Sequence, residues 1–412
     1  MRLTEQMEYA IISGNLNYLK AHRDELDEKN GKYPIDLYEN SVLAIAALNQ
    51  QVEIAKWICN KKLYDVKQEN LHGWSAVTLA ANRDSIDVLE LILERYPELL
   101  HCQNKAGFTP FLAAAMGGSA RVIDFLMVKD ESQTFENEQT LDGKNSLVMA
   151  AINGHTEIMK KLIQAGFSIE FINPKSGRTA LIEASLNARP EAAKLLVAHS
   201  ANLAVADNIG WTAIAFAANR NLLDVVEAIA QKQPELLHAK NNASFTPFLA
   251  AAMGGAADVI DFFLKKGSGQ IKQLEEEVTS GGKNALALAA INDYPEIVAQ
   301  LIKNGFSIDY KNPKSGRTAL IEASLNNKIN TVEFLIKTNS DIGLKDNHGY
   351  TALHLAAHSN DKATLDKFFQ LVPRDRLLPI LAVEANNRKT AKNLATKPEI
   401  IQYITEWIFA PS

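Results

Sequence analysis

Three histidines near the C-terminal end have the spacing most suggestive of chemistry. His354 and His358 are four residues apart and would share one face of a helix, with His348 just upstream. Imidazole nitrogens in such an arrangement can bind zinc. No glutamate follows in the His-Glu-x-x-His pattern of a zinc hydrolase. We therefore favour a structural role for these histidines and predict no metal site and no cofactor.

Two glycine-rich stretches invite comparison with phosphate-binding loops. They are Lys266-Gly-Ser-Gly and Ser280-Gly-Gly-Lys-Asn. Neither follows a predicted buried strand, and neither has the spacing that lets backbone amides surround a phosphate. The chain also has no nucleophile elbow and no paired-carboxylate motif. We predict no catalytic residue and expect that the protein is not an enzyme.

Composition narrows the class of protein further. Of 412 residues, 47% are apolar and 22% charged, as in an ordinary folded protein. The net charge of −5 gives no support to nucleic-acid binding. Cys59 and Cys102 form no Cys-x-x-Cys pair. No apolar run approaches the roughly 20 residues that span a bilayer. These features predict a cytoplasmic monomer without membrane insertion.

The chain contains a long internal duplication. The eleven residues from Phe108 to Gly118 recur unchanged from Phe245 to Gly255, and Asn173–Asn187 recurs as Asn312–Asn326. Within each copy, a turn glycine returns about every 34 residues, with Ser244 in place of one glycine. These glycines are Gly73, Gly107, Gly143, Gly177, Gly210, Gly282, Gly316 and Gly349. Such a period is typical of stacked repeats, and four repeats make one copy.

Each repeat has the pattern of two short helices. In the repeat that begins at Gly210, Thr212 is placed to cap a first helix that contains Ala217 and Ala218. Leu222 to Ile229 then carries an apolar stripe at helical spacing, typical of a second helix. A polar stretch leads to the next glycine and suits a tight turn.

Thr351-Ala-Leu-His-Leu-Ala-Ala357 and both Phe-Thr-Pro-Phe-Leu-Ala-Ala-Ala segments resemble the Thr-Pro-Leu-His-x-Ala signature of ankyrin repeats. The resemblance implies an all-α solenoid of eleven or twelve helix-turn-helix units, in which His354 hydrogen-bonds within the scaffold. We expect five segments: a capping repeat at 1–40, a degenerate repeat at 41–72, four-repeat modules at 73–209 and 210–348, and final repeats with a cap at 349–412.

Two charged inserts lengthen equivalent connections of the two copies. They span 129–142 and 266–280, and we expect them to project from the stack. The acidic run Glu275-Glu-Glu277 is interpreted as solvated. Lys175-Ser-Gly-Arg178 and Lys314-Ser-Gly-Arg317 place basic tips on one edge, either as solvated turns or as a grip for an acidic or phosphorylated partner segment.

The resemblance also implies a surface for a protein partner. In ankyrin stacks the residue after the turn glycine usually faces the concave surface, and residues near the end of the first helix share that surface. The first position, which we call the surface row, holds Trp74, Phe108, Lys144, Arg178, Trp211, Phe245, Lys283, Arg317 and Tyr350. The second set comprises Asn82, Arg83, Met116, Asn219, Arg220 and Met253. Such residue types are enriched at interfaces, although the rings could instead pack only against neighbouring turns.

Three functions remain open at this stage. The favoured one is a non-catalytic scaffold that binds a protein partner. The alternatives are an enzyme or enzyme modulator with a cryptic site in the inserts or C-terminal region, and a spacer that holds two partners apart. The Asn- and Lys-rich turns and the tandem duplication are similar to ankyrin effectors that intracellular bacteria deliver into the host cytosol, which would make the partner a host protein.

Overall fold

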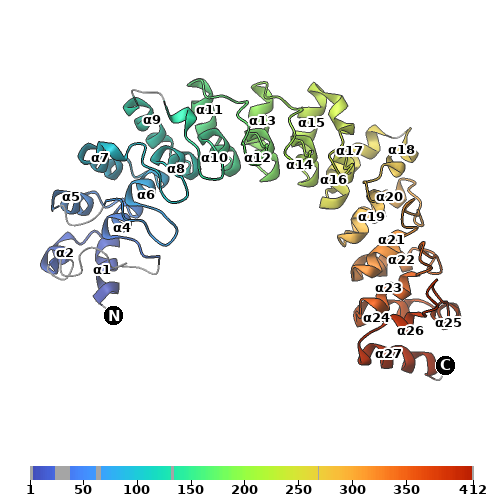
Figure 1. Cartoon of the computed structure of the whole chain (residues 1–412). Coiled ribbons are helices and arrows are strands. Elements are labelled where there is room, and N and C mark those ends of the chain that lie inside the picture. The colour runs from blue at the N-terminus through green and yellow to red at the C-terminus, as the bar shows by residue number, and fades with distance from the viewer. Residues whose placement is uncertain (1–2, 24–37, 62–65, 131–133, 268, 411–412) are drawn as a thin grey trace. The chain divides into compact units, whose positions relative to one another are not determined.

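The computed structural model describes residues 3–23, 38–61, 66–130, 134–267 and 269–410. Parts of the predicted segments 1–40, 41–72 and 349–412 and of both inserts lie outside these described residues. The chain divides into two compact units, Met1–Asn208 and Ile209–Ser412. Throughout the described residues the regular elements are helices, apart from an isolated bridge between Glu69 and Ser75. The predicted all-α, helix-turn-helix architecture is confirmed in both units (Figure 1).

The first unit repeats a pair of antiparallel helices, with one short 3-10 turn in each of two connections. Its elements are α1 (Leu3–Ile12), α2 (Leu16–Ala21), α4 (Val42–Leu48), α5 (Val52–Lys61), α6 (Ala76–Asn82), α7 (Ile86–Arg95), η1 (Pro97–Leu99), α8 (Pro110–Gly117), α9 (Ala120–Lys129), η2 (Phe135–Asn137), α10 (Ser146–Asn153), α11 (Thr156–Gln164), α12 (Ala180–Leu186) and α13 (Pro190–Ala198).

The second unit continues the same pattern and ends in a longer helix. Its elements are α14 (Ala213–Asn219), α15 (Leu223–Lys232), η3 (Pro234–His238), α16 (Pro247–Gly254), α17 (Ala257–Lys266), α18 (Ile271–Glu276), α19 (Ala285–Ile291), α20 (Pro295–Lys303), α21 (Ala319–Leu325), α22 (Ile329–Lys337), α23 (Ala352–His358), α24 (Lys362–Leu371), α25 (Arg374–Leu381), α26 (Ala391–Leu394) and α27 (Pro398–Phe409).

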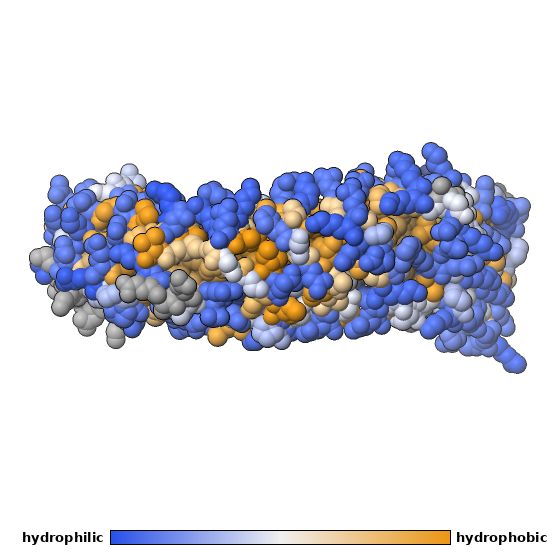
Figure 2. Space-filling model, turned by 90° about the horizontal axis from the view of Figure 1, so that it is seen from above, coloured by the Kyte–Doolittle hydropathy of each residue, from blue (hydrophilic) through white to orange (hydrophobic). Residues whose placement is uncertain are grey.

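The first helices form the core of each unit. In the first unit α6, α8, α10 and α12 pack one against the next, and in the second unit α14, α16, α19, α21 and α23 do the same. Within each unit, Figure 1 shows the first helices as one layer and the second helices as another. The first helices can approach closely because their central positions are alanine: Ala113, Ala114 and Ala115 are fully buried. The face in Figure 2 shows hydrophobic residues gathered between hydrophilic margins.

Capping residues begin the first helices as the sequence predicts. The side chains of Thr109, Thr179 and Thr318 accept hydrogen bonds from backbone amides of the first turn. Thr212 also occupies the N-cap position, but its side chain makes no capping hydrogen bond. The predicted cap at Thr212 is therefore correct in position and wrong in its hydrogen bond.

The inserts do not project freely, contrary to expectation. In the first insert Phe135 is 3% exposed and stacks on Phe111 of α8 at 4.2 Å between ring centroids. In the second, Leu274 is 6% exposed. Each insert therefore folds back on its unit, because its apolar residues gain more by burial than by exposure to water.

Candidate partner-binding site

A short hairpin-like turn positions each residue of the surface row. The carboxamide oxygen of Asn104 accepts the amide of Phe108 at 2.8 Å, four residues later. The equivalent bond joins Asn241 to Phe245 at 2.9 Å, and Asp346 to Tyr350 at 2.9 Å. The turn also requires a left-handed residue, and Ser244 adopts a φ of 61° where other repeats have glycine. At these three positions a polar residue four places earlier fixes the direction of the row residue, whereas the amides of Arg178 and Arg317 donate to Ser176 and Ser315, two places earlier.

Every residue of the surface row is half-buried, so none is a fully buried core residue and none is free on all sides. The aromatic members contact one another along the row. The rings of Trp74 and Phe108 lie 5.2 Å apart, and those of Trp211 and Phe245 lie 5.8 Å apart. Each pair packs between neighbouring turns and still presents apolar area to solvent.

Tyr350 has a more polar setting than the other aromatic residues of the row. Its hydroxyl accepts a hydrogen bond from the amide of Asn387 at 2.8 Å, and its ring lies 6.0 Å from that of His354. It therefore stands between the last full repeat and the C-terminal cap.

The first-helix set divides into structural and exposed members. Asn82 and Asn219 donate to the carbonyl oxygens of Ala113 and Ala250, at 3.1 Å and 3.0 Å, and so tie neighbouring first helices together. Met116 and Met253 are half-buried, and Arg83 and Arg220 are exposed. The side-chain amides are thus engaged by the scaffold, while the arginines face water.

Three of the four basic members of the row are held by carboxylates. Lys144 forms an ion pair with Asp142. Arg178 Nε lies 3.3 Å from Asp207, and its guanidinium lies 3.7 Å from Glu183. In the second copy Arg317 Nε lies 3.3 Å from Asp346, whose side chain is fully buried. Lys283, in contrast, has no ion pair with any residue that the structure describes.

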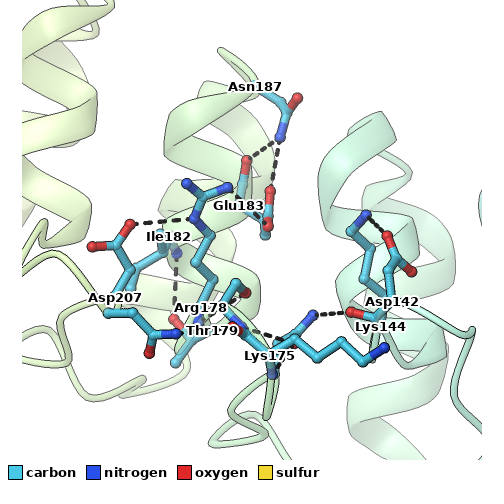
Figure 3. Close-up of polar contacts among 12 residues, drawn as sticks. Asp142, Lys144, Lys175, Arg178, Thr179, Ile182, Glu183, Asn187 and Asp207 are labelled. Carbon is cyan, nitrogen blue, oxygen red and sulfur yellow. Dashed lines mark hydrogen bonds and ion pairs between the residues drawn. The ribbon is translucent and has the colours of Figure 1, made fainter.

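Three basic residues, Lys144, Lys175 and Arg178, line a hollow of about 430 Å³ in the first unit, which we call the first hollow. It lies between α10 and α12 and the turns before them, and Asp142 and Glu183 also line it. Figure 3 shows Lys144 directed toward Asp142, and Arg178 between Asp207 and Glu183. Burial acts to raise the pKa of Asp142, but hydrogen bonds from Lys144 and Thr140 outweigh it and lower that pKa. The first hollow is therefore lined by charges of both signs.

Sequence reasoning missed the acidic half of this site. Glu183 is 5% exposed and accepts a hydrogen bond from Asn187 Nδ2 at 3.1 Å. A carboxylate inside the otherwise apolar Ala-Leu-Ile-Glu-Ala segment was the available signal. A charged residue in the middle of a short buried helix is rare unless it has a partner.

A glutamate of the first insert contacts a threonine and a histidine of the scaffold. Thr109 donates to Glu138, which also contacts His101 Nδ1 at 2.8 Å, and burial raises the pKa of Glu138. In the second copy Thr246 donates to Glu277 at 2.5 Å, and burial raises the pKa of Glu277 as well. Glu277 of the acidic run is thus packed against the scaffold and not solvated as predicted.

The contacts among His101, Glu138 and Thr109 are in the wrong order for a nucleophilic triad. In a triad the histidine contacts the hydroxyl, whereas here Glu138 stands between His101 and Thr109. The Thr109 hydroxyl also accepts the amide of Leu112 at 3.2 Å as the cap of α8. The geometry clamps the insert to the first helix and does not activate the hydroxyl.

His354, on α23, belongs to the scaffold. His354 is fully buried, its Nδ1 lies 2.8 Å from Thr351 Oγ1, and its Nε2 lies 3.0 Å from the carbonyl oxygen of Val383. Burial lowers the pKa of His354. Its predicted structural role is confirmed. Within the part of the chain that the structure describes, no three His, Cys, Asp or Glu side chains could hold a metal ion together.

The stacked helix pairs and the turns between them define a solenoid of helical repeats. A family model for ankyrin repeats matches residues 96–173, 147–236, 233–312 and 286–370, which together cover more than half of the sequence. The chain belongs to the ankyrin-repeat family.

Curated relatives carry the same repeats inside much longer proteins. The chain is 25% identical to the ankyrin repeat and KH domain-containing protein mask-1 of Caenorhabditis elegans over 77% of its own length and 13% of that protein. It is 25% identical to the human transient receptor potential cation channel subfamily A member 1, over 80% of this chain and 33% of the channel. It is 29% identical to rat protein phosphatase 1 regulatory subunit 12A over 30% of this chain and 12% of that subunit. The chain therefore spans a third or less of each of these relatives. Among the described residues no helix is long and apolar enough to cross a membrane.

Proposed function

We propose that the protein binds a protein partner through the surface row and the adjoining ends of the first helices. The observation that carries this proposal is the half-buried state of all the row residues. Aromatic rings that are held by their neighbours and yet partly exposed lose little conformational entropy on binding, and they are typical of interface hot spots. The Trp74–Phe108 and Trp211–Phe245 pairs would provide the apolar anchors.

The proposed role is non-catalytic. The alternative function places a cryptic site in the inserts or the C-terminal region, and the contacts of Glu138 in the first insert with Thr109 and His101 are arranged as a structural clamp. The name of one relative, a phosphatase regulatory subunit, is consistent with a binding role rather than a catalytic one.

Affinity capture from a eukaryotic cell lysate tests the surface row. The test variant replaces Trp74, Phe108, Trp211 and Phe245 with alanine. The control variant replaces Val128 and Phe409, which are 84% and 78% exposed and lie outside the row. We expect the test variant to lose partners that wild type and control retain, with helicity unchanged by circular dichroism. An unchanged partner set would refute the proposal.

We also propose, from the style of the sequence alone, that the protein is a bacterial effector that acts as a cytoplasmic monomer in a host cell. The tandem duplication and the Asn- and Lys-rich turns support this setting. A reporter fusion that stays inside the source bacterium during infection would contradict it. Light scattering after size-exclusion chromatography tests the monomer, which requires a mass near 45.3 kDa.

A further inference from the structure

The surface-row residues of the two copies are identical, but the turns that precede Lys144 and Lys283 differ in charge. Asp142, which pairs with Lys144 in the first copy, is replaced in the second copy by Gly281, two residues before Lys283. The backbone around this position is the same in both copies. Asn173 Nδ2 donates to the carbonyl oxygen of Asp142 at 3.0 Å, and Asn312 Nδ2 donates to that of Gly281 at 3.0 Å. The substitution therefore changes the charge while the turn keeps its shape.

The lysines have partners in one copy and lack them in the other. In the first copy Lys144 pairs with Asp142, and Lys175 Nζ donates to the carbonyl oxygen of Leu141 at 2.5 Å. In the second copy the ammonium groups of Lys283 and Lys314 have no partner among the residues that the structure describes. Both ammonium groups are therefore available to a ligand.

An arginine completes the second-copy surface. The Nε of Arg317 is used by buried Asp346, which fixes the guanidinium on the turn. Its terminal nitrogens form no ion pair with Glu322 among the described residues, unlike the Arg178–Glu183 contact of the first copy. A guanidinium that is already positioned can form charge-assisted hydrogen bonds to a carboxylate at a low entropic cost.

We propose that Lys283, Lys314 and Arg317 bind the carboxylates of an acidic segment in the protein partner, and that the first copy does not. This inference rests on the proposed partner-binding function of the surface row. In the first copy an incoming carboxylate meets the carboxylate of Asp142, which already neutralises Lys144. The duplicated surface thus contains one acidic-segment site and one closely matched site that is self-neutralised.

Exchanging the two residues tests the proposal. Gly281→Asp fits sterically, because a Cβ at this position would meet only Thr279 Oγ1, at 3.7 Å. Asp142→Gly is the reciprocal change. The probe is a fluorescein-labelled Gly/Ser decapeptide with four glutamates, and the control probe has glutamine at the same four positions. Binding to the full chain is measured by fluorescence anisotropy at about 10 mM ionic strength, where screening extends over roughly 30 Å.

We expect Gly281→Asp to weaken binding of the glutamate peptide about fivefold or more, since one added charge near 4 Å contributes at least about 1 kcal/mol even in water. We expect Asp142→Gly to increase the amount of peptide bound at saturation, because it creates a second site. The glutamine peptide should bind wild type and both variants equally weakly. Melting curves followed by circular dichroism confirm that each variant is folded.

Equal binding of the glutamate peptide by wild type and Gly281→Asp would overturn the proposal. Displacement by sodium phosphate, but not by sodium chloride of matched ionic strength, would indicate a small-anion site and would also overturn it. The lysate capture with the aromatic variant is a separate measurement. If capture depends on the aromatic residues while Gly281→Asp has no effect, the acidic-segment site is wrong and the proposed function stands.

Discussion

Replacing Gly117 with alanine tests whether the copied Met-Gly-Gly sequence is a packing requirement. A Cβ at position 117 would lie 2.0 Å from the backbone oxygen of Asn82 and 2.7 Å from its side-chain nitrogen. Backbone cannot move aside as a flexible side chain can, so α8 and α6 must separate. A Cβ at position 254 would lie equally close to the backbone oxygen of Asn219, and Gly254→Ala should behave in the same way.

The free energy of unfolding should fall by about 1–3 kcal/mol for Gly117→Ala. Overpacking a close contact costs about 1–3 kcal/mol. Separation of the helices also breaks the 3.1 Å hydrogen bond from Asn82 to Ala113, which contributes about 0.5–1.5 kcal/mol. Alanine in place of a helical glycine returns up to about 1 kcal/mol. The cost of overpacking exceeds the gain in helix propensity, so the net effect is destabilising.

Urea unfolding followed by circular dichroism measures the loss, and amide hydrogen exchange locates it in α6 and α8. Gly269→Ala is the matched control, because nothing lies within 4 Å of a Cβ at that position. We expect the control to be as stable as wild type. If Gly117→Ala were as stable as the control, the packing of the first helices would not depend on glycine and the reasoning would be wrong.

Three further predictions concern charge and thiol reactivity. Arg178→Ala should lower the free energy of unfolding by about 1–3 kcal/mol, because it removes the ion pair of Asp207, whose side chain is only 2% exposed. The loss should be smaller than for a fully buried pair, because the side chain of Arg178 is 29% exposed. An unchanged urea midpoint would contradict this. Burial raises the pKa of Glu138, so its contribution to stability is present below the unfolded pKa of about 4.3 and is lost as pH rises through the raised value. As pH rises from 4 to 7, the melting temperature of Glu138→Gln should therefore rise relative to that of wild type. If the difference between the two melting temperatures narrowed over this range, the raised pKa of Glu138 would be refuted. Cys102 is half-buried, whereas Cys59 is buried with a pKa raised by that burial, so a thiol reagent should modify Cys102 first and Cys59 only after unfolding.

The sequence predicts the fold well because the fold is local. Each repeat carries its own cap, its own pair of small residues and its own turn residue, so that errors in one repeat do not spread to the next. Even the replacement of glycine by Ser244 left the phase readable, and the structure confirms its left-handed backbone. Contacts between residues far apart in the sequence could not be predicted. The inward fold of the inserts depends on Phe135 meeting Phe111 across a connection, which no local pattern encodes.

The sequence predicted the positions of the candidate-site residues but not which of their charges are paired. The place after each turn glycine follows from the repeat, so the surface row could be written down in advance. Whether Lys144 is neutralised depends on Asp142 and on the turn that brings the two together, and the importance of Glu183 depends on its burial beside Arg178. Such pairings depend on side-chain geometry and burial, which a one-dimensional pattern does not specify.

Duplication makes the differences between the copies more informative than the identities. Identical segments such as Phe108–Gly118 and Phe245–Gly255 are explained by copying alone. A position that differs in charge while its hydrogen-bonded frame is unchanged, as with Asp142 and Gly281, alters the surface without altering the scaffold. The two equivalent turns therefore keep the same hydrogen-bonded frame with different charge, a difference that can favour binding of one partner in a single register along a repeated surface.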